Sequence, residues 1–257
     1  MIDFHSHILP GIDDGSVDME ISIKMIDISI SEGVECICAT PHFLPEEVEI
    51  KREFYFSKLE ELRNAVKKKN IEIISGVELY INPTLPKLYK ENKIWGINNK
   101  NYMLIELPMQ YFPLYTEEVF YELRILGITP ILAHPERNFE ILKNPNLLVN
   151  LINQGALAQM NSGSLTGRYG SKIEEFSKQL VKRNLIHLLG SDGHNISVRK
   201  PRIKQGFEKL KELNHPLYLS ILENEKKVIQ GVPIETLPIV DYKEGLLKSI
   251  FSVFKRS

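Results

Sequence analysis

Two histidines separated by one residue, His5 and His7, end the first β-like stretch of the chain, MIDFH, and the glycine-rich acidic loop PGIDDG follows them. A buried structural histidine usually occurs alone, because one backbone hydrogen bond satisfies it. Two imidazoles at one strand end, close to the carboxylates of Asp13 and Asp14, instead indicate a pair of metal ligands. The chemistry of such a pair depends on what the rest of the chain adds.

Most other apolar, β-branched runs also end in residues that bind metals. Along the chain these runs are MIDFH, VECICAT, IEIISGVE, NYMLIEL, ITPILAH, ALAQMN and IHLLGSD. The histidines and carboxylates at or just after their ends are His5, His7, His42, Glu78, Glu106, His134, Asp192 and His194. Each one alone could be a satisfied core imidazole or a helix cap. Their shared position favours a common role, whereas His187, inside a strand, and His215, at a helix start, receive none.

The elements between these runs predict how the residues meet. Apolar residues recur with a helical period, for example Ile23, Ile26 and Ile30 before Gly33. Strands that alternate with helices predict an α/β fold with a parallel sheet, and its right-handed crossovers predict that the sheet closes, or nearly closes, into a barrel of about seven strands, formed by one domain over residues 1–257. The carboxyl ends of parallel strands lie on one face of a barrel, so the candidate ligands should converge on one pocket.

The candidate ligands are too many for one ion. Imidazoles and carboxylates without a thiolate suit zinc, manganese or iron rather than calcium or an iron–sulfur cluster. One divalent ion takes about four to six donors, so this set, to which Asp14 could add one more, predicts two or three ions bridged by a carboxylate. Such ions lower the pKa of a bound water toward about 7 and therefore favour hydrolysis.

Two arginines point to a phosphoester as the bond that is hydrolysed. Arg137 follows His134 in HPER, and Arg199 follows His194 in SDGHNISVR, so both leave the rim that carries the ligands. A guanidinium binds phosphate oxygens through two parallel hydrogen bonds and keeps its charge. Each arginine alone could be a solvated surface residue, but their joint placement favours phosphate binding.

The two cysteines do not support a thiol mechanism. Thiol-based tyrosine phosphatases need an arginine six positions after the cysteine, and here His42 follows Cys36 and Leu44 follows Cys38 at that distance. We expect both to be buried thiols that form no disulfide, which is consistent with a cytoplasmic protein. No run of about 18 apolar residues is present to suggest a transmembrane helix.

The charge balance also narrows the partners. Lys and Arg number 32 against 33 Asp and Glu, so the net charge of −1 gives no overall field that would attract nucleic acid. The tail, residues 241–257, predicts an amphipathic C-terminal helix docked on the barrel or on a neighbouring subunit, which would suit a homo-oligomer; a membrane-surface helix is the alternative. Its apolar face would comprise Leu246, Leu247, Ile250, Phe251 and Phe254.

The segments HSH, TPH, GVE, IE, HPER and SDGH occur in this order, and together they resemble the PHP (polymerase and histidinol phosphatase) family. Within that family the chain is most similar to the bacterial PHP-type protein tyrosine phosphatases encoded with capsule and exopolysaccharide genes. Their opening pattern DxHxHxLPxxDDG matches IDFHSHILPGIDDG, and ATPHF, GVE, AHPER and SDGH follow in register. The resemblance covers roughly residues 1–230.

This resemblance implies a distorted seven-stranded barrel that holds up to three divalent metal ions, with manganese preferred and iron, zinc or magnesium as alternatives. It assigns the ions to His5, His7, His42, Glu78, Glu106, His134, Asp192 and His194. Either glutamate could bridge, and Asp14 would assist the leaving tyrosyl oxygen, either as an acid or through the metal shell. Arg137 and Arg199 would bind phosphate, with Arg202 as an alternative to Arg199. The implied partner is the tyrosine-rich C-terminal tail of an autophosphorylating bacterial tyrosine kinase.

Three rival functions remain open at this point. A small-molecule phosphatase, such as a histidinol-phosphate phosphatase, would share the metals and the fold. An amidohydrolase would also open with HxH, but it often uses a carboxylated lysine where this chain has Glu78 and Glu106. A PHP module without activity could serve as a binding domain. The loop ELPMQYFPLYTEE could supply an apolar wall for a phosphotyrosine ring through Met109, Tyr111, Phe112 and Tyr115, or it could merely cover the barrel mouth.

Overall fold

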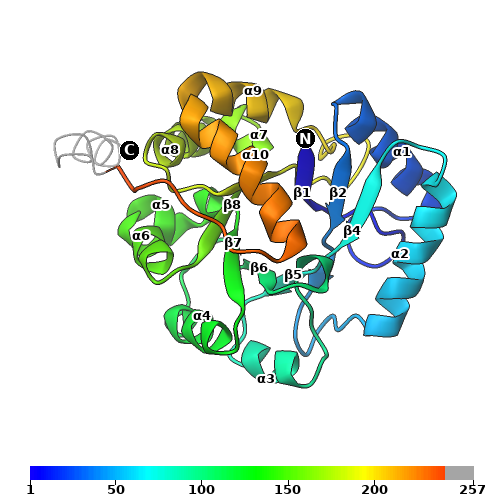
Figure 1. Ribbon diagram of the computed structural model, residues 1–257, viewed down its shortest axis with the longest axis horizontal. Coiled ribbons are helices and arrows are strands. Elements are labelled where there is room, and N and C mark those ends of the chain that lie inside the picture. Colours follow the sequence, from blue (N-terminus) through cyan, green and yellow to red (C-terminus); the bar gives the residue numbers. More distant parts are fainter. Residues whose placement is uncertain (241–257) are drawn as a thin grey trace.

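The computed structural model describes residues 1–240, in which parallel strands alternate with helices (Figure 1). The strands are β1 (Ile2–Ser6), β2 (Cys36–Ala39), β3 (His42–Phe43), β4 (Glu72–Ser75), β5 (Glu78–Tyr80), β6 (Tyr102–Glu106), β7 (Thr129–Ala133), β8 (Leu157–Asn161) and β9 (Leu188–Gly190). The helices are α1 (Met19–Ser31), α2 (Arg52–Val66), α3 (Leu85–Lys90), α4 (Thr116–Ile125), α5 (Phe139–Lys143), α6 (Asn146–Asn153), α7 (Ser162–Leu165), α8 (Ser171–Lys182), α9 (Lys204–Leu213) and α10 (His215–Gln230). Two 3₁₀ turns, η1 (Ile97–Asn99) and η2 (Pro135–Arg137), complete the described elements.

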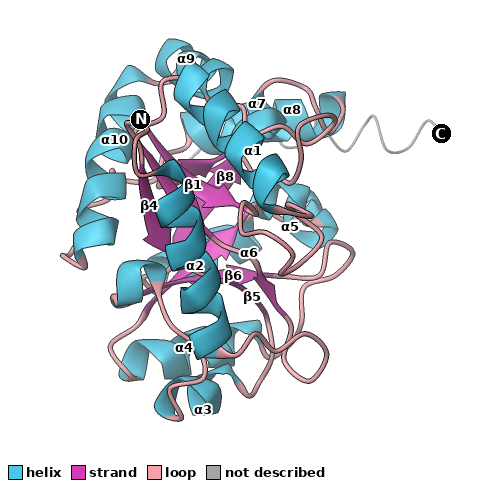
Figure 2. Cartoon of the chain, turned by 90° about the vertical axis from the view of Figure 1, so that its right-hand side faces the viewer, coloured by secondary structure: helices cyan, strands magenta, loops and turns pink. Residues whose placement is uncertain are grey.

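The strands form a distorted barrel, which confirms the predicted fold class. One parallel sheet has the order β1-β2-β4 and the other has the order β3-β5-β6-β7-β8-β9. The two sheets meet where β1 lies beside β9, since the Asp192 amide donates to the His5 carbonyl (2.8 Å) and the His7 amide donates to the Gly193 carbonyl (2.9 Å). Figure 2 shows the strands inside and the helices around them.

Two of the seven predicted strands are interrupted in the structure. The second divides into β2 and β3 at Pro41, which has no amide hydrogen to donate to a ladder, and the third divides into β4 and β5 at Gly76. The buried Tyr55 of α2 joins the two breaks: its hydroxyl donates to the Ala39 carbonyl (2.9 Å) and accepts from the Gly76 amide (2.9 Å). One side chain thus replaces the lost ladder partners and fixes the strand pieces that lead to the site.

The half of the barrel interior at the amino ends of the strands is filled mainly by apolar side chains. Phe4, Cys38, Ile74 and Leu104 meet inside the barrel, and α10 adds Val228. Figure 1 shows α10 crossing the amino-terminal end of the strands. Close packing of this core holds the carboxyl ends of the strands in fixed positions.

The two cysteines lie in this core. Cys36 and Cys38 are buried free thiols, as predicted. Burial raises the pKa of both thiols above their ordinary value, so neither is prone to ionise to a nucleophilic thiolate.

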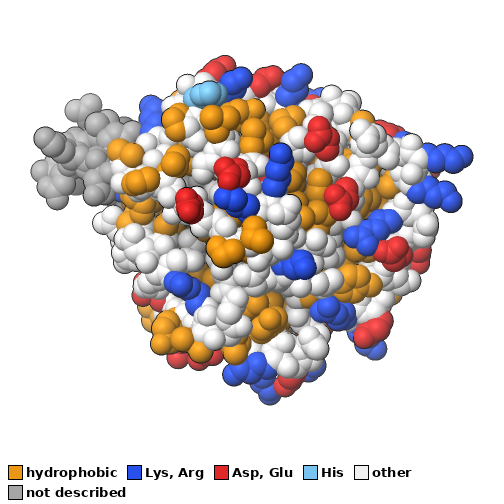
Figure 3. Space-filling view, viewed as in Figure 1, with side chains coloured by type: hydrophobic (Ala, Val, Ile, Leu, Met, Phe, Trp, Pro, Cys, Tyr) orange, Lys and Arg blue, Asp and Glu red, His pale blue; other side chains and the backbone are white. Residues whose placement is uncertain are grey.

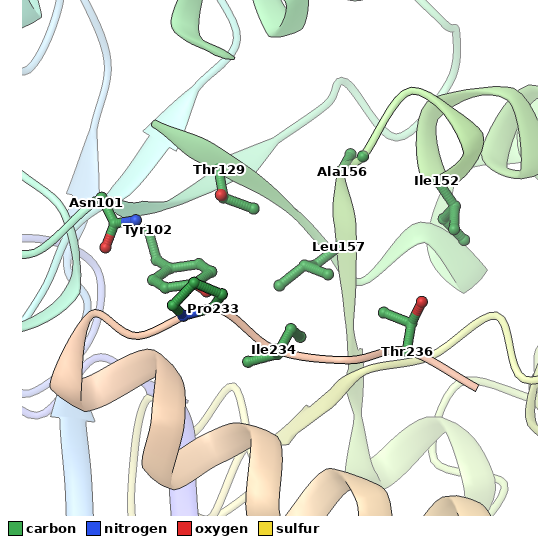
Figure 4. Close-up of a pocket in the computed structure, with 10 residues that line it drawn as sticks. Asn101, Tyr102, Thr129, Ile152, Ala156, Leu157, Pro233, Ile234 and Thr236 are labelled. Atoms are coloured by element: carbon green, nitrogen blue, oxygen red, sulfur yellow. The ribbon is translucent and has the colours of Figure 1, made fainter. Parts of the chain in front are cut away.

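The last described segment, residues 231–240, runs beneath the barrel. The Tyr102 hydroxyl donates to the Val232 carbonyl (2.8 Å), and Figure 4 shows Pro233 and Ile234 over a cavity of about 270 Å³ beside Leu157. This cavity lies at the amino ends of the strands, opposite the face where barrels carry their active sites. It therefore does not belong to the candidate site.

The surface gives no sign of a large charged interface on the side that carries α10. Figure 3 shows Lys and Arg side chains interspersed with Asp and Glu on this face. Within residues 1–240, no helix has the length and apolar character needed to cross a bilayer. The predicted amphipathic helix at 241–257 lies outside the described residues.

His187 predicts a pH dependence of stability. Its buried Nδ1 accepts from the Ala158 amide (3.0 Å), and burial lowers its pKa to about 4. In the unfolded chain this imidazole has a pKa of about 6.5, so between pH 6.5 and 4 the unfolded state binds more protons than the folded state. The free energy of unfolding therefore falls by about 3 kcal/mol as the pH drops from about 6.5 to 4. His187→Gln should flatten this fall in urea unfolding with chelator present. The exposed His215→Gln is the control, and equal slopes in wild type and His187→Gln would contradict the prediction.

Candidate metal centre

An irregularity in β1 turns both histidines of HSH toward the barrel axis. Between Asp3 and Ser6 the strand takes three residue steps against two in β2, so one residue is inserted, as in a β-bulge. Consecutive residues can then face the interior: Phe4 packs in the apolar core, and His5 joins the polar layer above it. His7 follows on the same side, with its Nε2 3.1 Å from the His5 Nε2.

Glu78 lies at the centre of this polar layer. Its Oε2 lies 3.2 Å from His5 Nε2, 3.3 Å from His7 Nε2 and 3.0 Å from His42 Nδ1. Its Oε1 lies 3.0 Å from His134 Nε2. One buried carboxylate thus contacts imidazoles from three different strand ends and from the loop between β1 and α1.

The structure brings all the predicted ligands together. Their donor atoms fall into four groups, each with its atoms within 4.8 Å of one another: His7, Asp14, His42 and His194; His5, Glu78 and His134; His5, His7 and Asp192; and His42, Glu78 and Glu106. Several buried donors, including His194 Nε2, make no hydrogen bond with any residue of 1–240. Imidazole and carboxylate donors that share residues between groups fit a cluster of divalent ions.

The charges in the cluster are strongly coupled. Burial acts to raise the pKa of Glu78, but the imidazoles of His5, His134 and His42 overcome it and hold that pKa well below its usual range. Burial and the charge of Glu78 raise the pKa of Glu106 to about 8. Without ions, therefore, ionisation of both carboxylates together is unfavourable, and divalent cations would compensate the negative charge of both.

Two ligands adopt a backbone conformation that non-glycine residues rarely use. His134 has φ 31° and Asp192 has φ 53°, both in the left-handed region. At His134 the turn redirects the chain into η2, so His134 faces the cluster and Arg137 returns over it. Each such residue costs on the order of 1 kcal/mol, and residues of this kind gather at functional sites.

Arg137 and Arg199 approach the cluster from opposite sides of Asp192. Arg137 Nη1 donates to Asp192 Oδ2 (2.9 Å), and Arg199 Nη2 donates to Asp192 Oδ1 (2.7 Å). Arg202 behaves differently: its side chain is exposed, and no hydrogen bond or ion pair within residues 1–240 joins it to the cluster. The geometry thus favours Arg199 over Arg202 as the second guanidinium at the site.

Asp14 lies at the solvent side of the cluster. Its Oδ1 is 3.4 Å from His194 Nε2 and 3.6 Å from His42 Nε2, and its side chain is 63% exposed. The nearby imidazole of His194 lowers the pKa of Asp14, so this carboxylate is ionised at neutral pH. An ionised Asp14 suits metal coordination better than proton donation.

An outer layer of polar residues orients the ligands, and these residues were not among the predicted site residues. Asp13 Oδ2 lies 2.6 Å from His7 Nδ1 and accepts from the His42 amide (2.9 Å). From β8, Gln159 Oε1 lies 3.0 Å from His5 Nδ1, and Asn161 Nδ2 donates to Asp192 Oδ2 (2.7 Å). Two sequence features could have indicated this layer: the two aspartates that follow HSH, and the amide side chains in ALAQMN.

A second buried carboxylate holds η2 in place. Glu136, the acidic residue of HPER, accepts from the Asn161 amide (3.0 Å) and from the Ser164 hydroxyl (2.6 Å). It therefore ties the turn that presents Arg137 to the end of β8. Glu136 was not among the predicted site residues.

The barrel and its cluster of imidazoles and carboxylates define the chain as a PHP-type β/α-barrel protein. The family model described as "Capsular polysaccharide synthesis, CpsB/CapC" matches residues 1–230, and the chain belongs to this family. The resemblance found in the sequence is confirmed.

Individual relatives match over nearly their whole length. CapC of Staphylococcus aureus is 39% identical over 95% of this chain and 97% of its own. The tyrosine-protein phosphatase YwqE of Bacillus subtilis is 34% identical over 98% of this chain and 100% of its own. A crystal structure from a set of B. subtilis YwqE and Streptococcus pneumoniae CpsB, described as metal-dependent tyrosine phosphatases, superposes with a TM-score of 0.90 at 33% identity, covering 95% of this chain and 100% of that one.

The contact between Asp13 and His7 predicts a role in metal affinity. Asp13→Asn keeps the shape of the side chain but removes the charge that orients the imidazole, so the affinity for Mn²⁺ should fall about 10- to 100-fold. Competition against a fluorescent chelator measures this. Asp18→Asn, at the exposed N-cap of α1, is the matched control and should bind as wild type does. Unchanged affinity in Asp13→Asn would refute the role.

Proposed function

We propose that this chain is a metal-dependent protein tyrosine phosphatase that acts on a phosphoprotein of capsule or exopolysaccharide synthesis. The observation that carries the proposal is the meeting of the ligand cluster with two guanidinium groups at Asp192. The cluster suits divalent ions, and the guanidinium groups suit phosphate oxygens. The names of YwqE and CpsB as tyrosine phosphatases support the same activity.

The proposed ligands are His5, His7, His42, Glu78, Glu106, His134, Asp192 and His194, with Asp14 at the solvent side. Glu78 is the better candidate for the bridging carboxylate, because it contacts four imidazoles. When bound, the ions supply Lewis acidity toward phosphoryl oxygens and lower the pKa of water. We propose up to three ions, with manganese preferred over iron, zinc or magnesium.

The arginines would bind and orient the phosphoryl group. Each guanidinium has further N–H donors besides the one that it gives to Asp192, so both can reach a phosphoryl group above the cluster. Their fixed positive charges would neutralise the equatorial oxygens as the ester bond breaks. Asp13, Gln159 and Asn161 would keep the ligands oriented while the substrate binds.

The mouth of the barrel supports a protein as the substrate. The loop after β6 carries Tyr111 and Leu114, whose relative exposures are 55% and 101%. Asn138, next to Arg137, holds this loop by donating to the carbonyls of Pro108 (2.7 Å) and Tyr111 (3.0 Å). A loop whose backbone is held next to a proposed phosphate-binding arginine, and which carries exposed apolar side chains, suits a tyrosyl ring and its flanking polypeptide.

The proposed partner is the tyrosine-rich C-terminal tail of an autophosphorylating bacterial tyrosine kinase. We place the reaction in the cytoplasm, where buried free thiols such as Cys36 and Cys38 stay reduced. A small-molecule phosphatase, such as one for histidinol phosphate, is the alternative. A higher kcat/KM for histidinol phosphate than for a phosphotyrosine peptide would favour that alternative.

Arginine variants test the assignment of the phosphate-binding groups. Arg137→Ala and Arg199→Ala should each lower kcat/KM for a phosphotyrosine peptide by about 100-fold or more, because a preorganised donor to the reacting phosphoryl group is lost. Arg202→Ala, which removes an exposed guanidinium three residues from Arg199, is the matched control and should keep activity close to wild type. Elemental analysis should give equal metal content in all the variants. Loss of activity in Arg202→Ala but not in Arg199→Ala would reverse the assignment.

A further inference from the structure

The loop that follows β8 and α7 returns to the site. The loop forms a well-defined turn: Gly167 and Gly170 have positive φ values of 80° and 92°, and the Arg168 amide donates to the Gly163 carbonyl (3.0 Å). These constraints leave little freedom to Tyr169, which lies between the two glycines. No ligand was predicted at this strand end, and no role was predicted for the loop.

Tyr169 contacts one of the two proposed phosphate-binding arginines. The Arg137 Cζ lies 4.5 Å from the centroid of the Tyr169 ring, in the arrangement of a cation–π pair. Arg137 also donates to Asp192, so the guanidinium lies between the carboxylate and the aromatic face. The ring thus limits the rotamers available to Arg137 on the side away from the cluster.

The hydroxyl of Tyr169 is buried, yet it makes no hydrogen bond with any residue of 1–240. Buried tyrosine hydroxyls usually find a partner, so this one calls for an explanation. Burial, with a smaller contribution from the charge of Asp192, raises the pKa of Tyr169, so the phenol stays protonated and can act as a donor. Arg137 and Arg199 both lie close enough to act on it electrostatically.

A phosphoryl group bound between Arg137 and Arg199 would bring an acceptor oxygen to this region of the site. We propose that Tyr169 is a substrate-binding residue, whose ring holds Arg137 against the cluster and whose hydroxyl donates a third hydrogen bond to a non-bridging phosphoryl oxygen. This inference rests on the proposed function. It adds to the two guanidinium groups of the phosphate site a third donor group, the Tyr169 hydroxyl, which is neutral and rigidly placed.

Two substitutions separate the hydroxyl from the ring. Tyr169→Phe keeps the contact with Arg137 and removes the donor, so the KM for a phosphotyrosine peptide and the calorimetric Kd for inorganic phosphate on the manganese-loaded protein should both rise about tenfold, with kcat little changed. Tyr169→Leu also removes the aromatic face, so kcat should fall as well. Tyr121→Phe, an exposed tyrosine of α4, is the control and should change neither constant.

The readouts distinguish this role from a structural one. Metal content and Tm should be the same in wild type and Tyr169→Phe. If Tyr169→Phe has the same KM and the same phosphate Kd as the wild type, the inference is wrong. The proposed function still holds in that case, provided that the wild-type enzyme hydrolyses the phosphotyrosine peptide. Conversely, the wild-type protein could bind phosphate more tightly than Tyr169→Phe and yet hydrolyse no phosphotyrosine peptide. That outcome would refute the proposed function but support the contact between Tyr169 and phosphate.

Discussion

The structure depends on keeping one ionised carboxylate, Glu78, fully buried among imidazoles. An isolated charge at this depth would cost several kcal/mol, and the neighbouring imidazoles compensate it only if they stay within about 3 Å. That requirement explains the rigid surroundings of the cluster. The apolar half of the barrel interior fixes the strands, and Tyr55 fixes the two interrupted ones at the point where they break.

The same constraint explains why unfavourable local conformations persist at the site. His134 and Asp192 have left-handed backbones, and each directs a ligand inward while an arginine farther along the chain returns to Asp192. Asp192 therefore links the ligand cluster with both guanidinium groups. Because the ligand cluster and the two guanidinium groups meet at Asp192, the site can bind a phosphate next to divalent ions.

The ligands could be predicted from the sequence because a β/α barrel places every strand end on one face, so residue type and position together were sufficient. The break at Pro41 follows from the missing amide hydrogen of proline. The inserted residue in β1 and the break at Gly76, in contrast, could not be predicted, since they depend on contacts with β2 and Tyr55. Asp13 and Tyr169 were missed for a similar reason: their roles arise from side chains distant in sequence. Arg199 and Arg202 both follow His194 closely in the sequence, and only the folded structure shows that Arg199, and not Arg202, donates to Asp192.

The central claim is that bound divalent ions at this cluster enable phosphotyrosine hydrolysis. The most direct measurement is phosphate release from a phosphotyrosine peptide by protein purified without chelator, then stripped with chelator, and then resupplied with Mn²⁺, each with and without a thiol-blocking reagent. We expect release to be lost on stripping, to return with Mn²⁺ and to be insensitive to the thiol reagent. Release that survives stripping, or none from a fully metal-loaded sample, would contradict the central claim.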